Sequence, residues 1–289
     1  MEDKFTINIC TKDRHTELFG LLLSLKNQTI KNWELVIVDG SQTPITTRQF
    51  IQQAVNELQH NGHKVIVARE KQRGVCHARN QAVEESKTEV ICRIDDDSYC
   101  APDYLEKLWN LMKKGADCAG GLVPAFGSPR LIRNSSLLNK VFNEIKFDKE
   151  GNLICVNCGF RGINIRAPAI CEKCGESYIG DKAAMLHYPN VIKTSHHLRS
   201  SFMFRKSQWE KVGGYDTWTG FTGWREETLF CMKLHWAGYK KFITDTSAIA
   251  WHMNCSTGGV RTADYGTQLV AIEDKFREWA KLRYEVKGW

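Results

Sequence analysis

The chain has 289 residues, a formal net charge of +7, 42% hydrophobic and 25% charged residues, and six prolines. This composition excludes a long disordered or fibrous chain and allows one large domain, or two small ones, with a buried core. No run approaches the roughly 18 apolar residues of a membrane-spanning helix, and the positive charge would attract an anionic partner such as a phosphate-bearing ligand or nucleic acid.

The N-terminal sequence and the cysteines indicate a cytoplasmic protein. The start, MEDKFTINIC, has no apolar segment followed by a small-residue cleavage site. Of the 11 cysteines, four form two CxxC pairs, and the others are scattered: Cys10, Cys76, Cys92, Cys100, Cys118, Cys231 and Cys255. We expect these scattered cysteines to be free core thiols, because a cytoplasmic compartment disfavours a disulfide framework.

Strand and helix patterns alternate through the first 125 residues. Apolar, strand-like runs cover 5–10, 33–40, 63–68 and 89–94. Helical patterns cover 16–28, 47–62 and 75–86, followed by a helix over 102–115 and a strand over 117–123. Repeated strand-helix units with continuous apolar strands predict an α/β domain whose parallel sheet carries helices on both faces.

Regular patterns fade between 126 and 199 and then return. The later regular segments are 200–216, 226–239, KFITD and AIAWHM, and the last is an amphipathic helix over about 267–283.

Three consecutive aspartates, Asp95, Asp96 and Asp97, end the fourth predicted strand. Two carboxylates separated by one residue suit a hard divalent cation, Mn²⁺ or Mg²⁺, which keeps positions open for phosphate. A solvated loop or a helix cap is the alternative reading. Ligands of such sheets bind beyond the carboxyl ends of the strands, where other polar residues also lie: Thr11 to Arg14, Asp39, Ser41 and Arg69 to Arg73.

The order of these motifs resembles that of GT-A fold glycosyltransferases, especially family 2. The resemblance covers most of 5–125 and 200–254, and its motifs are ICTKDR, VIVDGSQ, RGVCHARN and RIDDDS. It implies a GT-A fold, with a Rossmann-like, mixed but mostly parallel sheet flanked by helices. It also implies a metal-dependent enzyme that moves a sugar from a nucleotide-sugar donor, UDP-linked, to an acceptor hydroxyl.

The resemblance implies donor-binding roles for Thr11, Asp13, Arg14, Asp39, Arg79, Asp95 and Asp96. Thr11 and Asp39 would hold the nucleobase, Arg79 would stabilise the nucleotide, and Asp95 would face the ribose and the metal. Asp96 would point toward the donor sugar or solvent. Considered alone, Thr11 and Asp39 are as typical of turns as of a donor-binding site.

The metal ligands and the base also follow from the resemblance. Asp95 and Asp97 would bind Mn²⁺ or Mg²⁺ together with His252 of WHM, although a lone histidine beside tryptophan is usually a packed one. Glu227 occupies the position of the family's catalytic aspartate, with Glu226 beside it, and the choice between them stays open. The alternative interpretation is that both glutamates lie in the first turn of a helix only because the helix dipole favours negative charge there.

The paired cysteines Cys155, Cys158, Cys171 and Cys174 resemble a zinc ribbon. Four thiolates at this spacing form a closed, structural Zn²⁺ site, and two disulfides are the alternative. Basic residues near the ribbon would suit phosphate contacts. Hydroxymethylated DNA is therefore one expected acceptor, and a glycan, a lipid carrier or a protein side chain are the others. A non-catalytic zinc-ribbon protein that binds nucleic acid on a GT-A scaffold is the rival reading.

The expected organisation has four parts. They are a nucleotide-sugar-binding half over 1–125, an insertion over 126–199 with the zinc ribbon at 155–174, an acceptor and catalytic half over 200–255, and a C-terminal helical segment over 256–289. The sequence does not indicate an oligomeric state.

Overall fold

The structure is a computed structural model of the chain. It describes residues 4–124, 198, 200–253, 255, 257–260, 268, 270–276 and 278–279, and the backbone of short strands between 146 and 194. The chain divides into two compact units, Met1–Val123 with Ile192–Trp289, and Pro124–Val191.

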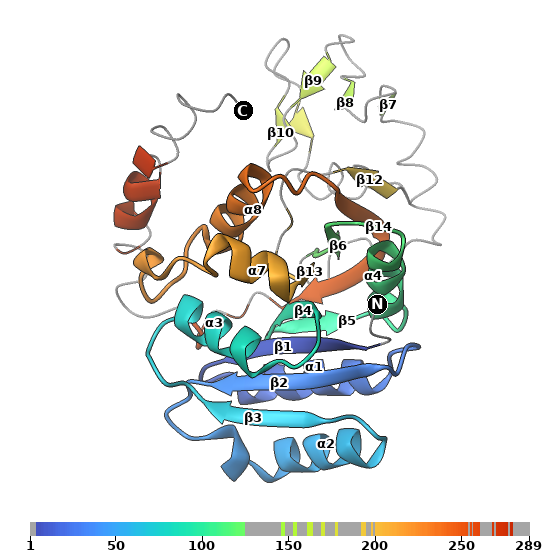
Figure 1. The fold of residues 1–289 in the computed structure, drawn as a ribbon, viewed down its shortest axis with the longest axis vertical. Helices are drawn as coiled ribbons and strands as arrows, with labels where there is room; N and C mark the ends of the chain where they lie inside the picture. Colours follow the sequence, from blue (N-terminus) through green and yellow to red (C-terminus); the bar gives the residue numbers. More distant parts are fainter. Residues whose placement is uncertain are drawn as a thin grey trace. The chain divides into compact units, whose positions relative to one another are not determined.

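The first unit is built on a nine-stranded sheet. Its strands are β1 (Phe5–Thr11), β2 (Trp33–Asp39), β3 (Val65–Arg69), β4 (Val90–Asp95), β5 (Ser98–Cys100), β6 (Cys118–Leu122), β12 (Ile192–Thr194), β13 (Phe202–Arg205) and β14 (Phe242–His252). They follow the order β12-β14-β6-β13-β4-β1-β2-β3, and β5 pairs with β14. Figure 1 shows β4, β1, β2 and β3 side by side in this order.

Six of the nine strands, β1, β2, β3, β4, β6 and β14, run in one direction, and β5, β12 and β13 run antiparallel to their neighbours. β1 pairs in parallel with β2 and β4, β2 with β3, and β14 with β6. β13 runs antiparallel between β4 and β6. The expected mixed, mostly parallel sheet is therefore confirmed.

Helices cover both faces of this sheet because neighbouring apolar residues of a strand point in opposite directions. The helices are α1 (His15–Lys26), α2 (Gln49–His60), α3 (Val75–Glu85), α4 (Tyr104–Lys113), α7 (Lys206–Val212) and α8 (Glu226–Trp236), with short 3-10 turns η1 (Ile45–Thr47) and η3 (Thr217–Thr219). On β2, Leu35 and Ile37 belong to the core under α1, α2 and α4. Val36 and Val38 pack against α3 on the other face.

The strand register brings the predicted site residues to one edge of the sheet. Thr11 at the end of β1 lies beside Asp39 at the end of β2. On the other side of β1, Cys10 lies beside Asp95 at the end of β4. The aspartate triplet and the TKDR turn thus meet at the carboxyl ends of adjacent parallel strands.

The segments KFITD and AIAWHM, which stand apart in the sequence pattern, form one strand in the structure. Both segments belong to β14, whose register against β6 shifts between Thr244 and Ile249. Within this irregular stretch, the Asp245 carboxylate accepts hydrogen bonds from the backbone N–H and hydroxyl of Ser247 at 2.8 and 2.7 Å. The polar DTS sequence resembles a turn, but these local bonds let the strand continue through it.

The second unit is described only as short strands. β7 (Lys146–Phe147), β8 (Leu153–Ile154) and β9 (Arg161–Ile163) form one sheet, and β10 (Ala169–Ile170) pairs with β11 (Ser177–Tyr178). The four predicted zinc ligands, Cys155, Cys158, Cys171 and Cys174, lie outside the described residues. The zinc ribbon and the four-part organisation therefore stay predictions.

Two further expectations concern the described part of the chain. The seven scattered cysteines are free, as predicted; five are buried, while Cys10 and Cys255 are partly exposed. Among the described helices, none is long and apolar enough to cross a bilayer.

Candidate active site

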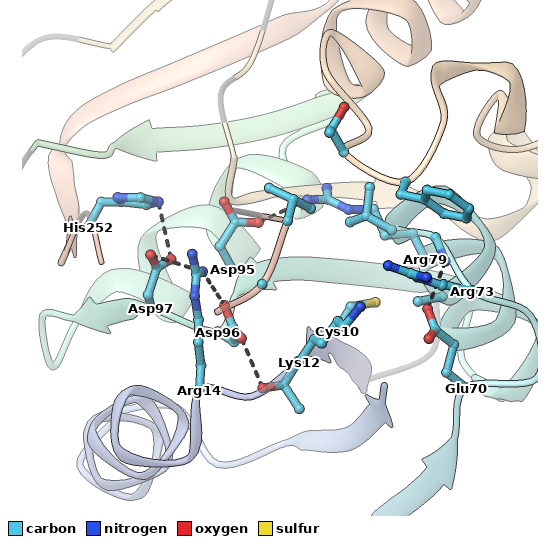
Figure 2. A pocket seen from close by; sticks show the side chains of 18 residues that line it. Cys10, Lys12, Arg14, Glu70, Arg73, Arg79, Asp95, Asp96, Asp97 and His252 are labelled. Carbon is cyan, nitrogen blue, oxygen red and sulfur yellow. Dashed lines mark hydrogen bonds and ion pairs between the residues drawn. The ribbon is translucent and has the colours of Figure 1, made fainter. Parts of the chain in front are cut away.

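A cavity of about 180 Å³ opens at the carboxyl ends of β1 and β4 (Figure 2). Its walls come from the end of β1, the turn before α3, the aspartate triplet, the segment before α8, and the end of β14 with the residues after it. The lining residues are Cys10, Thr11, Lys12, Arg14, Glu70, Arg73, Gly74, Val75, Ala78, Arg79, Asp95, Asp96, Asp97, Phe221, Thr222, His252, Gly259 and Val260.

Arg14 supplies positive charge inside the aspartate triplet. Its Nη1 lies 2.9 Å from Asp96 Oδ1 and 3.1 Å from Asp97 Oδ2, and Figure 2 shows the guanidinium directed at both carboxylates. All three side chains are almost fully buried. The repulsion between neighbouring aspartates is therefore offset by a buried ion pair as well as by any metal that binds.

Asp96 is fully engaged with protein groups. Besides Arg14, the Thr11 hydroxyl donates to Asp96 Oδ2 at 2.9 Å. Burial raises the pKa of Asp96 to about 6, although the Arg14 guanidinium opposes the rise. The side chain is only 5% exposed, so the alternative in which Asp96 faces solvent is wrong.

Asp95 pairs with two other arginines. Arg79 on α3 lies 3.1 Å from Asp95 Oδ1, and Arg93 on β4 lies 3.4 Å from the same oxygen. Asp95 and Arg79 both line the cavity. The helix motif HARN and the aspartate triplet therefore meet in one site, as their order in the sequence indicates.

The same two arginines bind Glu226 at the start of α8. Arg93 forms a two-pronged pair with it at 2.8 and 3.1 Å, and Arg79 Nη1 lies 2.8 Å from Glu226 Oε1. Arg93 is 4% exposed and lies over the rings of Phe202 and Tyr215. The network joins the cavity, which Arg79 lines, to the first turn of α8.

Glu226 and Glu227 have different environments. Burial raises the pKa of the Glu226 carboxyl, and the Arg93 guanidinium opposes the rise. A hydrogen bond with Glu227 raises it further, because one of the two carboxyls must then carry a proton. Glu227 is partly exposed, and neither glutamate lines the cavity.

Three cavity residues have the chemistry of a Mn²⁺ or Mg²⁺ site. Asp95, Asp97 and His252 all line the cavity, and His252 Nε2 lies 3.2 Å from Asp97 Oδ1. Carboxylate oxygens and an imidazole nitrogen are ligands that Mn²⁺ accepts, so the donor set fits the ion. Among the described residues, no group of three or more His, Cys, Asp or Glu is already arranged around a metal position. Asp97 is paired with Arg14 instead.

Asp39 and Asp13 are engaged in the turn after β2. The fully buried Asp39 carboxylate accepts from the backbone N–H groups of Ser41 and Ile45, each at 2.9 Å, and from Arg69 Nη1. Asp13 Oδ1 accepts from the backbone N–H of Gln42 at 2.8 Å. Neither aspartate lines the cavity, so their roles in donor binding stay predictions.

Sequence reasoning missed several residues of the site. Arg93 was read as part of an apolar strand, although a lone arginine inside VICRID indicates a buried partner. Phe221 lies on the cavity wall with 49% of its surface exposed, and the Arg73 guanidinium lies 4.6 Å above its ring. No sequence signal pairs these two residues, because the loops that carry them are far apart in the chain.

Comparison with known proteins identifies the family. An α/β sheet with a polar, aspartate-rich cavity at its strand ends has the arrangement in which open sheets of this class bind ligands. Residues 6–171, more than half of the chain, match the sequence profile of glycosyl transferase family 2. The chain therefore belongs to glycosyl transferase family 2, as the order of its motifs predicts.

Individual relatives agree with this assignment. The glucosyl-dolichyl phosphate glucuronosyltransferase of Haloferax volcanii is 25% identical over 226 residues, covering 76% of this chain and 58% of the relative. The chain thus spans little more than half the length of that relative.

Two solved structures share the fold. One is the mannosyltransferase PcManGT from Pyrobaculum calidifontis in complex with GDP-Man and Mn²⁺, with a TM-score of 0.55 and 16% identity over 94% of this chain and 64% of that chain. The other is S. aureus TarS, with a TM-score of 0.54 and 14% identity over 88% of this chain and 37% of that chain. These likenesses support the GT-A type of fold that the sequence predicts.

Proposed function

We propose that the protein transfers a sugar from a nucleoside diphosphate donor to an acceptor hydroxyl, with the help of a divalent metal. The observation that carries this proposal is the cavity itself. It gathers the aspartate triplet, His252 and several basic side chains at the carboxyl ends of adjacent parallel strands, where sheets of this type bind nucleotides.

The basic residues of the cavity suit a diphosphate. Lys12, Arg14, Arg73 and Arg79 line the same space as the aspartates. Arginine forks match phosphate oxygens in geometry as well as charge. A UDP-linked sugar is our proposed donor, while the structural relative PcManGT was solved with GDP-Man, so the two nucleotides must be compared directly.

Asp95, Asp97 and His252 would hold the Mn²⁺ or Mg²⁺ ion. When bound, such an ion supplies positive charge that stabilises the departing diphosphate. Arg14 lies 3.1 Å from Asp97 in the structure and places a positive charge beside this buried carboxylate.

Glu227 is the proposed base. A base must accept the proton of the acceptor hydroxyl, and a carboxylate that is already held by two arginines is poorly suited to this. Glu226 is held in this way by Arg93 and Arg79. Glu227 is partly exposed on the same helical turn, so the structure favours it over Glu226.

The acceptor stays the least determined part of the proposal. A DNA acceptor and the structural Zn²⁺ rest on residues outside the described part of the chain. The name of the Haloferax volcanii relative indicates a lipid-linked sugar as its acceptor, which supports the lipid carrier among the acceptors expected from the sequence.

A transfer screen tests the proposal. The purified protein with Mn²⁺ would receive UDP- and GDP-sugars together with oligosaccharides, polyprenyl phosphate sugars, plain DNA or hydroxymethylated DNA, and products would be read by mass. We expect the mass increment of one hexosyl or pentosyl residue on one acceptor class, lost in the Asp97→Asn variant. Transfer to oligosaccharide or lipid alone would refute the DNA acceptor. Absence of transfer and of donor hydrolysis with every sugar would refute the catalytic proposal and favour a non-catalytic binding protein.

A further inference from the structure

The residue before the catalytic helix has an unusual backbone conformation. Arg225 occupies the N-cap position of α8 with φ 65° and ψ 9°, in the left-handed region. This region costs a non-glycine residue about 1–2 kcal/mol. No side chain caps the N-terminus of α8, so other contacts must hold Arg225 in this conformation.

Glu273 provides these contacts from the C-terminal segment. Its carboxylate accepts from Arg225 Nε at 2.9 Å and from Arg225 Nη2 at 3.1 Å, and it also accepts from Trp224 Nε1 at 2.8 Å. The Arg225 guanidinium lies 5.3 Å from the ring centres of both Trp224 and Phe276. One carboxylate therefore binds the two residues that lead into α8.

The segment that carries Glu273 packs along α8 and the turn before it. Residues 270–276 are helical. Ile272 is 8% exposed, and its Cδ1 lies near Gly220 in that turn. The Trp279 ring lies 5.3 Å from Trp236 at the last residue of α8. The C-terminal segment thus contacts both ends of α8, with Glu273 at the catalytic end.

The conformation of Arg225 determines where α8 begins. Its carbonyl accepts from the backbone N–H of Leu229 at 2.8 Å, in the first turn of the helix. Glu226 and Glu227 directly follow Arg225 in the chain. Their direction therefore depends on the backbone that Glu273 holds through the Arg225 side chain.

We propose that Glu273 is a positioning residue for the transfer reaction. It holds Arg225 in the left-handed conformation and thereby aligns Glu227, and it does not line the cavity itself. This inference rests on the proposed function, because Glu227 is the base only within that proposal. It assigns a role in the reaction to the C-terminal helical segment.

Hydrolysis of the nucleotide-sugar provides a test that needs no known acceptor, because water then takes the place of the hydroxyl. The assay uses Mn²⁺ and the UDP- or GDP-sugar that the wild type hydrolyses fastest. For Glu273→Ala we expect kcat to fall about 10- to 100-fold, the range for a small misplacement of a reacting group. The donor Kd, measured by calorimetry, stays unchanged. Glu273→Gln keeps the volume and one acceptor oxygen, so it retains part of the activity even if the alanine variant folds poorly.

Asp274→Asn is the matched control, because it removes an exposed carboxylate from the neighbouring position of the same helix. We expect it to match the wild type. Hydrogen exchange supplies a readout independent of catalysis, in which backbone amides of 226–229 exchange faster in Glu273→Ala than in the control. Wild-type kcat in Glu273→Ala, or a parallel loss of kcat and donor binding, would overturn the positioning role. Full activity in Glu227→Gln would instead refute the base assignment, and the exchange result would still test the contact between Glu273 and Arg225.

Discussion

Replacing Arg93 with methionine would remove one of the two arginines that pair with the buried Glu226 carboxylate. Arg93 and Glu226 are each 4% exposed, and their two contacts measure 2.8 and 3.1 Å. Breaking a buried ion pair from one side typically costs about 3–5 kcal/mol, because the remaining charge has lost its water and its partner. Arg79 stays 2.8 Å from Glu226, so we expect the lower end, about 3 kcal/mol.

Urea unfolding, followed by tryptophan fluorescence, measures this loss. The double variant Arg93→Met/Glu226→Met serves as the control, since it removes both charges and should be more stable than Arg93→Met alone. In Arg93→Met, burial raises the pKa of Glu226 without opposition from Arg93, so the native state binds a proton more readily than the unfolded chain. The decrease in the free energy of unfolding caused by Arg93→Met should therefore become smaller as the pH falls. A loss below about 1 kcal/mol, the range of exposed pairs, or a double variant less stable than the single one, would refute the reasoning.

Three further predictions test other parts of the structure. Gly223→Ala should lower the free energy of unfolding by about 1–3 kcal/mol, because a Cβ there would lie 2.0 Å from Val75 Cγ1 and the backbone φ is +57°; wild-type stability in urea would contradict this close approach. Burial lowers the pKa of His63, which stacks on Trp33 with ring centres 3.5 Å apart. Its contribution to stability is present above the unfolded pKa of about 6.5 and is lost as the pH falls through the folded pKa. The urea midpoints at pH 7.5 and pH 5.5 should thus differ less in His63→Phe than in the wild type. An equal difference in both proteins would exclude His63 as a cause of the pH dependence of stability. Finally, Glu227→Gln should lower kcat for donor hydrolysis by about 10²–10⁴-fold while calorimetry finds the donor Kd unchanged; an active Glu227→Gln variant would return the role of base to Glu226 or another group.

Much of the fold follows from the sequence because local patterns determine it. Continuous apolar runs that end in polar residues give the position of β1, β2 and β4, and the strand order then brings the motifs to one edge. The extent of β14 does not follow in this way, because the polar segment DTS interrupts its apolar pattern. Only the side-chain bonds of Asp245 and the pairing with β6 show that the strand continues.

The pairing of charges in the site could not be predicted from the sequence in the same way. Arg93 and Glu226 are separated by 133 positions, and the pattern VICRID does not say which partner the arginine reaches. The strand alternation explains the outcome: Cys92 and Ile94 belong to the core under α1, so Arg93 points to the opposite face, where α8 packs. Likewise, the aspartate triplet indicates that a positive charge lies nearby. The sequence does not show that the Arg14 guanidinium is such a charge and pairs with Asp96 and Asp97.

A calorimetric titration of UDP and of GDP, each with Mn²⁺ and with EDTA, tests the central claim most directly. We expect that one nucleotide binds the wild type with Mn²⁺, and that both EDTA and Asp97→Asn weaken this binding strongly. Equal affinity with and without Mn²⁺, unchanged in Asp97→Asn, would contradict a metal-dependent donor site at the aspartate triplet.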